Sequence, residues 1–200
     1  MSPTVHRVTT PGPRSAVRAH PDREVSGEAP DVLAAGLVAH VGFVAGGQPY
    51  VIPMSYQYQT ADPKRLYLHG AHSSRLLDHL ASGAPVCVTV TLVDGLVYSR
   101  TALYHSVNYR SVVCFARAAP EPAPETRRRV LEAMIARYFP GRTPGRDYES
   151  VPAAHLEATA FIALEIEEWS AKARRGGPTG PRDADPIAWG TAGVVPLSQL

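Results

Sequence analysis

Cysteine and lysine are scarce in this chain of 200 residues, which contains two of each. Cys87 and Cys114 lie within apolar, β-branched runs and lack the CxxC spacing of metal-binding motifs, which predicts free cysteines buried in strands. The lysines are Lys64 and Lys172, so arginine carries almost all of the positive charge. The planar fork of arginine suits phosphates and carboxylates, although genome composition can produce the same bias. A net charge of +2 is too small to indicate a nucleic-acid partner.

Long apolar segments are also missing. Residues 1–15 have no apolar core of the kind that defines a signal peptide, and no apolar run is long enough to cross a bilayer. We therefore expect a cytoplasmic protein that does not bind membranes.

Several familiar motifs are absent as well. The chain has no GxGxxG after a strand, no GxxxxGKS or GxxxxGKT, no HExxH and no GxSxG. These absences argue against the common nucleotide, zinc and hydrolase sites, and we predict no metal site.

The pattern that is present predicts a mainly β protein with peripheral α-helices. Residues 1–30 hold five prolines without a sustained period, which predicts an extended N-terminal arm before a single domain over residues 31–200. About six strands with short turns, one short helix after the third strand and one long helix before the last are typical of an antiparallel barrel. The expected strands cover 40–47, 49–60, 66–70, 85–99, 110–120 and 158–175, and the expected helices begin near 74 and 125.

Residues 66–80 organise the chain, because an alternating strand runs into a turn and then into an amphipathic helix. Gly70 permits the sharp backbone change, and Ser73 or Ser74 can cap the helix beside Arg75. Free backbone N–H groups and the helix dipole would then face a phosphate. An ordinary capped helix with a surface arginine is an equal alternative.

Two further features bear on strand geometry. Pro53 has no N–H for a ladder, which places its strand at an edge, at a bulge or beside something other than a strand, such as a flat ligand ring. Asp94-Gly95 is a turn signal within residues 85–99.

Five segments in this order resemble a known family: GQPYVIPMSY, LYLHGAHSSRLLDHL, VCVTVTLVDGLVYS, HSVNYRSVVCFARA and SAKARRGG. The chain resembles the pyridoxamine 5′-phosphate oxidase-like branch of the FMN-binding split barrels, which includes the 5-nitroimidazole reductase (Nim) proteins, over roughly residues 33–195. The resemblance implies a six-stranded antiparallel split β-barrel that forms a homodimer, with two FMN molecules in clefts between the subunits.

The resemblance also implies which residues bind the cofactor. One strand passes beside the isoalloxazine ring, the next strand ends near it, the helix start grips the phosphate, and a later strand and the C-terminal region face the cleft. These residues are Val51, Ile52, Pro53, Met54, Ser55, His69, Gly70, Ser74, Arg75, Arg110, Ser111, Lys172, Arg174 and Trp189.

The helix start departs from the family pattern. Family members commonly carry an Arg-Lys pair where this chain has Arg75-Leu76. A charged hydrogen bond to phosphate contributes roughly 1.5–3 kcal/mol, so affinity would fall about tenfold or more unless Arg100 or Arg110 substitutes. The alternative is that the chain prefers a different ligand.

His69 is the candidate catalytic residue, because the Nim branch associates a histidine near the flavin with catalysis. A neutral imidazole there could donate a proton to a small organic substrate that accepts hydride. A histidine hydrogen-bonded within the turn is an equal alternative.

The predicted function is an FMN-dependent oxidoreductase that moves hydride or electrons from a reduced donor to a small organic acceptor. A non-catalytic flavin-binding or storage protein, or a split barrel that uses a deazaflavin or heme, is the alternative. Oxidation of pyridoxamine 5′-phosphate itself is disfavoured, because the segment after Trp189 contains no arginine or histidine for a substrate phosphate.

Overall fold

The structure, a computed structural model of the chain, describes residues 12–120 and 122–198. One antiparallel sheet has the strand order β2-β1-β5-β6-β7-β4-β3, and β8 pairs with β5 outside this order. The strands are β1 (Val38–Ala45), β2 (Gln48–Ser55), β3 (Gln57–Tyr58), β4 (Arg65–Gly70), β5 (Val86–Tyr98), β6 (Ser106–Ala118), β7 (Ala160–Arg174) and β8 (Gly193–Pro196).

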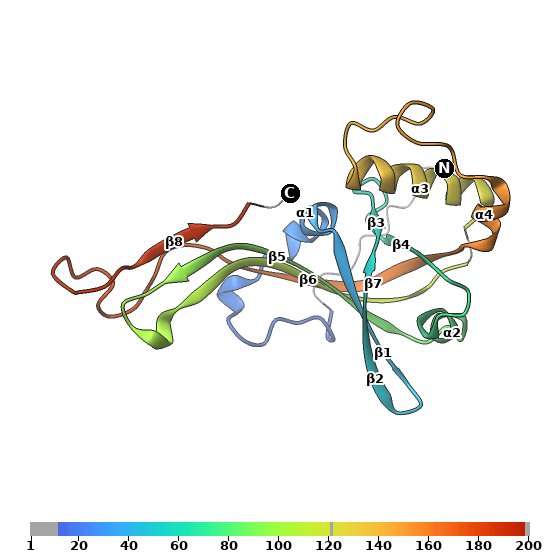
Figure 1. Cartoon of the computed structure of the whole chain (residues 1–200). Coiled ribbons are helices and arrows are strands. Elements are labelled where there is room, and N and C mark those ends of the chain that lie inside the picture. The colour runs from blue at the N-terminus through green and yellow to red at the C-terminus, as the bar shows by residue number, and fades with distance from the viewer. Residues whose placement is uncertain (1–11, 121, 199–200) are drawn as a thin grey trace, which may run out of the picture.

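The sheet has two ends with different surroundings (Figure 1). At one end the sheet curls, and α2, α3 and α4 lie around it. At the other end β5, β6 and β8 project as a three-stranded extension, hereafter the strand extension. The strand extension exists because β5 and β6 contain 13 residues each, longer than the typical strand.

Alternation of side chains builds the barrel core. In β5 every second residue from Val86 to Leu92 is buried, as expected for a strand with one face on a core. Val88 and Val90 are fully buried and pack in the same cluster as Cys114, which confirms the prediction of a buried free cysteine in that strand. Cys87, on the other face, is half-buried and also free.

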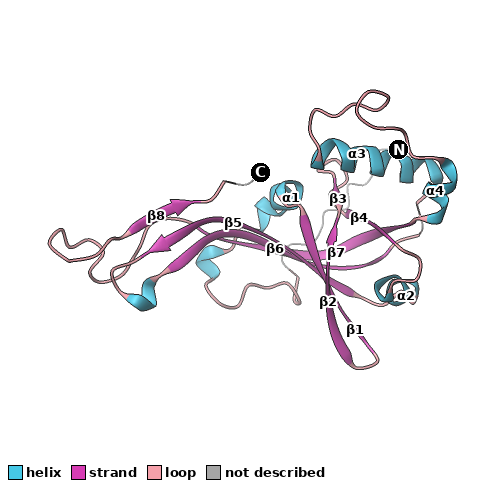
Figure 2. Cartoon of the chain, viewed as in Figure 1, coloured by secondary structure: helices cyan, strands magenta, loops and turns pink. Residues whose placement is uncertain are grey.

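In the part of the chain that the structure describes, four α-helices and three 3-10 turns accompany the sheet (Figure 2). They are α1 (Ala29–Ala35), α2 (Arg75–Ala81), α3 (Pro124–Tyr138), α4 (Ala153–Ala158), η1 (Pro21–Arg23), η2 (Ser26–Glu28) and η3 (Ala102–Tyr104). The predictions of α2, α3 and β7 are confirmed to within two residues at each end. In the described part of the chain, no helix is long and apolar enough to span a membrane.

Arg137 of α3 forms hydrogen bonds that connect α3 to the sheet and to α1. Its guanidinium donates hydrogen bonds to the carbonyl oxygens of Tyr56, Leu33 and Gly36 and lies 4.6 Å from the centre of the Tyr56 ring. Burial raises the pKa of the Tyr56 phenol to about 12, so it remains a neutral donor to the Leu33 carbonyl. The Tyr56 N–H donates to the Tyr138 hydroxyl and not to a neighbouring strand. The strand pairing is therefore interrupted at Tyr56, between β2 and β3.

The fold confirms a mainly β split barrel, but the described residues form eight strands where six were predicted. The segment 49–60 divides at Tyr56, and β8 is a short addition that local alternation does not show. The predicted turn at Asp94-Gly95 is wrong: β5 continues through it with a β-bulge between Val93 and Gly95. A Cβ on Gly95 would lie 2.9 Å from the Val195 carbonyl oxygen, so the glycine permits β8 to approach.

The described part of the N-terminal arm lies along β7. The Val25 N–H donates to the Ala171 carbonyl at 2.9 Å, and Lys172 Nζ donates to the Ala19 carbonyl at 2.7 Å. The arm includes η1 and η2 and ends at α1, which begins at Ala29 without a side-chain cap. Residues 1–11 of the predicted arm lie outside the described residues.

Candidate functional site

The end of β2 meets the end of β4, as the predicted ring site requires. The Met54 methyl carbon lies 3.6 Å from the position that a Cβ on Gly70 would occupy, so the two strand ends are in close contact. β2 is an edge strand that pairs only with β1, which confirms the edge placement of Pro53. Val51 is 65% exposed on this edge.

His69 lies in the last positions of β4 and pairs with Phe161 of β7. The two rings stack with their centres 5.8 Å apart, and Nδ1 of His69 is buried without a hydrogen-bond partner. Burial lowers the pKa of the imidazole, so the ring is neutral near pH 7. No described residue forms a hydrogen bond with this Nδ1, and the catalytic role of His69 stays a prediction.

The start of α2 follows the predicted geometry only in part. Ser74 is the N-cap, and its Oγ accepts a hydrogen bond from the Leu77 N–H at 3.3 Å. The Arg75 guanidinium is exposed and lies 4.4 Å from the centre of the Tyr50 ring on β2, without an ion pair to any described residue. Leu76 is fully buried in the core, which explains why a second cation does not follow Arg75.

Other predicted site residues lie far from His69 in the same protomer. In the register of the sheet, Arg110 pairs with Ala173, twelve positions along β7 from Phe161, and Ser111 pairs with the preceding residue, Lys172. At 3.3 Å per residue, this separation is roughly 40 Å along the strand. The two predicted groups therefore do not form one site within a single chain.

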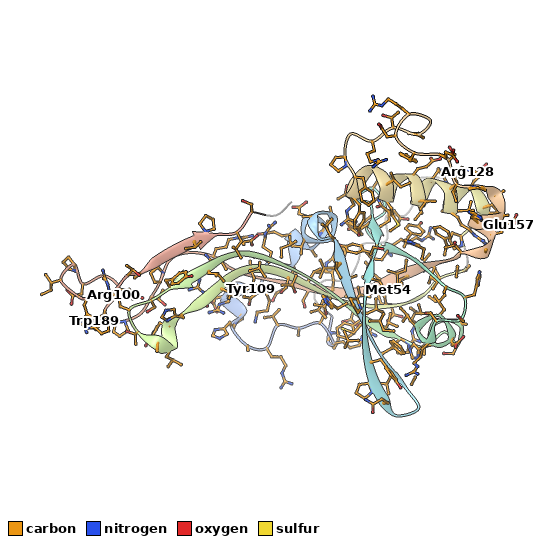
Figure 3. All side chains as sticks on the ribbon, viewed as in Figure 1. Met54, Arg100, Tyr109, Arg128, Glu157 and Trp189 are labelled. Atoms are coloured by element: carbon orange, nitrogen blue, oxygen red, sulfur yellow. The ribbon has the colours of Figure 1, made fainter. Side chains whose placement is uncertain are left out.

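Arg110 and Arg100, the two arginines considered as substitutes for the missing second cation, lie away from Arg75 in the same protomer. Arg110 donates two hydrogen bonds to the Asp94 carboxylate, at 2.9 and 2.7 Å, and this partner raises its pKa. Arg100 lies at the tip of the strand extension, where Figure 3 shows it beside Trp189 and far from Met54. Neither guanidinium lies beside Arg75 of the same protomer.

Arg100 and Asp183 build the tip loop, residues 180–190. Arg100 donates to the carbonyl oxygens of Asp183 and Asp185 at 2.9 Å each and to that of Gly190 at 3.2 Å. Asp183 accepts from the Ser99 hydroxyl and from the backbone N–H groups of Arg100 and Gly180, which lower its pKa despite its desolvation. The loop holds Trp189 with 84% of its surface exposed.

Two cavities border α2. An apolar cavity of about 530 Å³ lies between α2 and the β1–β2 hairpin, and its wall includes Phe43, Tyr50 and Val51. A second cavity of about 580 Å³ is lined by His72, Phe161 and other residues of α2, β6 and β7. Both volumes lie in the range that holds small-molecule ligands.

Sequence reasoning missed several residues that shape these regions. Phe161, Tyr50 and Asp183 had no local signal, because each acts on a residue more than 20 positions away. Among residues 12–120 and 122–198, no group of three or more histidine, cysteine or acidic residues is arranged to hold a metal ion.

Solved structures similar to this chain include two proteins with more than 30% sequence identity to it. The flavocytochrome Anf3 of Azotobacter vinelandii is 31% identical, with 94% of this chain and 86% of that chain covered and a TM-score of 0.79. The FAD and heme binding protein of Mycobacterium smegmatis is 34% identical, with 88% and 84% covered and a TM-score of 0.74. A candidate 5-nitroimidazole antibiotic resistance protein of Bacteroides thetaiotaomicron, 21% identical over 74% and 84% with a TM-score of 0.60, shares the fold. No curated protein matches the chain.

The family model for pyridoxamine 5′-phosphate oxidase matches residues 26–173, from η2 to the end of β7. The match contains the β2–β4 junction, His69 and the start of α2, and the split-barrel architecture agrees with it. The chain therefore belongs to the pyridoxamine 5′-phosphate oxidase family, a family of flavin-binding split barrels, as its motifs predicted.

Proposed function

We propose that this chain is a flavin-dependent oxidoreductase whose flavin ring lies at the junction of β2 and β4. The single observation that carries the proposal is His69, a half-buried neutral imidazole with an unpartnered Nδ1 at that junction. Buried polar atoms without a partner are rare, and they mark places where a ligand or water completes the hydrogen bonding. Met54 of β2 lies close to Gly70 at this junction.

The residues at the junction have separate roles in this proposal. The flavin supplies hydride and electron transfer when bound. The β2 segment from Val51 to Ser55 provides a backbone surface with an open edge for the ring, and Arg75 provides a cation for a phosphate. His69 holds or delivers the proton that a small acceptor needs when it receives hydride, and its neutral state at pH 7 suits proton exchange.

FMN is the flavin that the resemblance implies, whereas one relative is an FAD and heme binding protein and another is a flavocytochrome. Heme binding is accordingly the second candidate function. The cavity of about 580 Å³ beside α2 has His72 on its wall, and this imidazole would be the iron ligand. A heme there would add one-electron chemistry to the flavin.

We also propose that the protein functions as a homodimer, because the strand extension has an unpartnered apolar face. Leu96, Val107 and Val195 are neighbours across three strands and are 37%, 38% and 48% exposed. A contiguous exposed apolar face of this kind is typical of an interface. A two-fold partner would cover this apolar face and bring the Arg110 end of one protomer towards the other protomer.

Light scattering tests the dimer. A mass of twice 21.5 kDa is expected at micromolar concentration. A stable species of 21.5 kDa would contradict the dimer and leave the two groups of predicted site residues separate.

The visible spectrum of the purified protein, before and after addition of FMN, FAD or hemin, tests the cofactor. Flavin binding predicts absorption near 450 nm with quenched fluorescence, and heme predicts a Soret band. A protein that binds none of the three at micromolar concentration would contradict the proposed function.

His69→Gln separates turnover from cofactor binding. Glutamine keeps a hydrogen-bond donor of similar size but cannot exchange a proton near neutral pH, so flavin should bind and be reduced by dithionite as before. Steady-state reduction of an acceptor should fall at least about tenfold, since general acid catalysis typically contributes 10²–10⁴ in rate. An unchanged rate would support the non-catalytic flavin-binding alternative.

Arg75→Ala tests the phosphate contact. FMN affinity should fall about tenfold or more, because a charged hydrogen bond is lost, while riboflavin affinity should stay nearly constant. Equal losses for both ligands would show that Arg75 acts through its packing on Tyr50.

A further inference from the structure

The cavity of about 580 Å³ beside α2 has a lining that favours one class of ligand. One wall is α2, and the other consists of the end of β6, the residues after it and the start of β7. Most lining residues are apolar, among them Leu77 and Leu80 of α2, Ala118 of β6, and Phe161 and Ile162 of β7. A largely apolar cavity of this volume with a few polar groups is typical of a binding site for a small organic molecule.

The charge on this lining is negative. Asp78, in the first turn of α2, contributes a carboxylate, and the described lining contains no lysine or arginine. The Asp78 side chain is exposed and forms no hydrogen bond or ion pair with another described residue, so its carboxylate is available to a ligand. The other polar side chain of the lining is the imidazole of His72. Because complementary charge is a source of binding specificity, this lining favours a cation over an anion.

Phe161 gives the cavity an aromatic wall and connects it to His69. Only 3% of Phe161 is exposed, and its ring stacks on the His69 imidazole with the two centres 5.8 Å apart. Aromatic rings pair with one another in offset or edge-to-face arrangements, and their faces attract cations. A planar aromatic cation in the cavity would therefore have Phe161 as a ring partner and Asp78 as a charge partner.

We propose that this cavity binds a small aromatic amine in its ammonium form. The aromatic group packs on Phe161 and the apolar side chains around it, and the ammonium donates a hydrogen bond to the Asp78 carboxylate. An acid of the same shape would place its own carboxylate beside Asp78, so the site should discriminate by charge. Because Phe161 is also the stacking partner of His69, a bound amine should change the environment of that imidazole.

Heme is the other candidate for this cavity, and the two occupants exclude each other. Heme carries two propionate carboxylates, for which the described lining provides no lysine or arginine. Asp78 would repel a propionate placed beside it. The charge of the lining therefore favours the amine.

Isothermal titration of the full chain, without added flavin, tests the site with three probes of one shape. 2-Phenylethylamine should bind at about millimolar concentration, as expected for a ligand of this size. The neutral 2-phenylethanol should bind more weakly, and the anionic 3-phenylpropanoate should not bind detectably. Stronger binding of the acid than of the amine, or no binding of the amine, would overturn the proposal.

Asp78→Asn should weaken binding of the amine by about tenfold and leave the alcohol nearly unchanged, because only the charged hydrogen bond is lost. Asp31→Asn is the matched control, because Asp31 is an exposed aspartate in the first turn of α1, another helix of seven residues. Both variants remove a favourable helix-dipole charge, so their thermal unfolding should shift equally. Equal losses of amine affinity in the two variants would contradict the role of Asp78.

Nuclear magnetic resonance of the histidine rings tests the contact with Phe161. The His69 signals, identified by their loss in His69→Gln, should shift when 2-phenylethylamine is added, and unchanged signals would contradict this placement. A hemin Soret band that is lost in His72→Ala, in a protein that does not bind the amine, would assign the cavity to heme and overturn the proposal. Amine binding that depends on Asp78 in a protein that binds no flavin would support this site and contradict the proposed oxidoreductase function.

Discussion

Replacing Leu76 by lysine restores the Arg-Lys pair that is common in the family, and we expect this change to destabilise the protein. Leu76 is fully buried and belongs to the core cluster of the barrel, so the new ammonium group cannot reach a phosphate without leaving the core. Sequence comparison alone would predict tighter FMN binding, whereas the structure predicts a loss of folding stability.

The size of the effect follows from burial. Removing a buried leucine side chain forfeits about 1.5–3 kcal/mol of apolar burial. A buried charge without a partner costs about 3–5 kcal/mol, part of which lysine avoids by losing its proton or displacing the first turn of α2. We expect a net loss of about 3–5 kcal/mol in the free energy of unfolding, which for a chain of this length lowers Tm by roughly 6–20 °C.

Calorimetry and chemical denaturation of Leu76→Lys measure this loss directly. Leu76→Met is the control, because a hydrophobic residue of similar volume should cost less than about 1.5 kcal/mol. A Leu76→Lys protein with unchanged Tm and tighter FMN binding would refute the placement of Leu76 in the core and the account of the helix start.

Two other predictions concern stability and strand pairing. Burial lowers the pKa of His69 in the folded protein, so the unfolded chain binds more protons below about pH 6.5. The free energy of unfolding of wild type should therefore fall as pH falls through that value. His69 contributes a slope of at most about 1.4 kcal/mol per pH unit. Chemical denaturation at pH 5 and 7 should show a smaller loss for His69→Gln, and an equal loss would show that His69 is not desolvated. Gly95→Val should detach β8 from β5, because the Cβ of the new side chain would lie 2.9 Å from the Val195 carbonyl oxygen. Hydrogen exchange of the backbone N–H groups of residues 193–196 should then accelerate. Unchanged protection of these groups would contradict the assigned pairing.

Much of the fold could be predicted from local sequence, because periodicity and capping act over a few residues. Alternation placed β5 and β6 and the buried Cys114, and Ser74 with the apolar positions after it placed α2. The proline of β2 indicated an edge strand, which the strand order confirms. Motif order was enough to predict the family, the split barrel and the flavin-binding class.

Only the tertiary structure decided which predicted site residues lie together. The register of β7 against β4 and β6 places His69 and Arg110 at opposite ends of one long strand, and nothing local to either residue reports that register. The contacts of Arg100 with Asp183 and of Gly95 with Val195 each join segments more than 80 residues apart. Such pairings depend on how strands meet after the chain has closed long loops, and local periodicity carries no information about them.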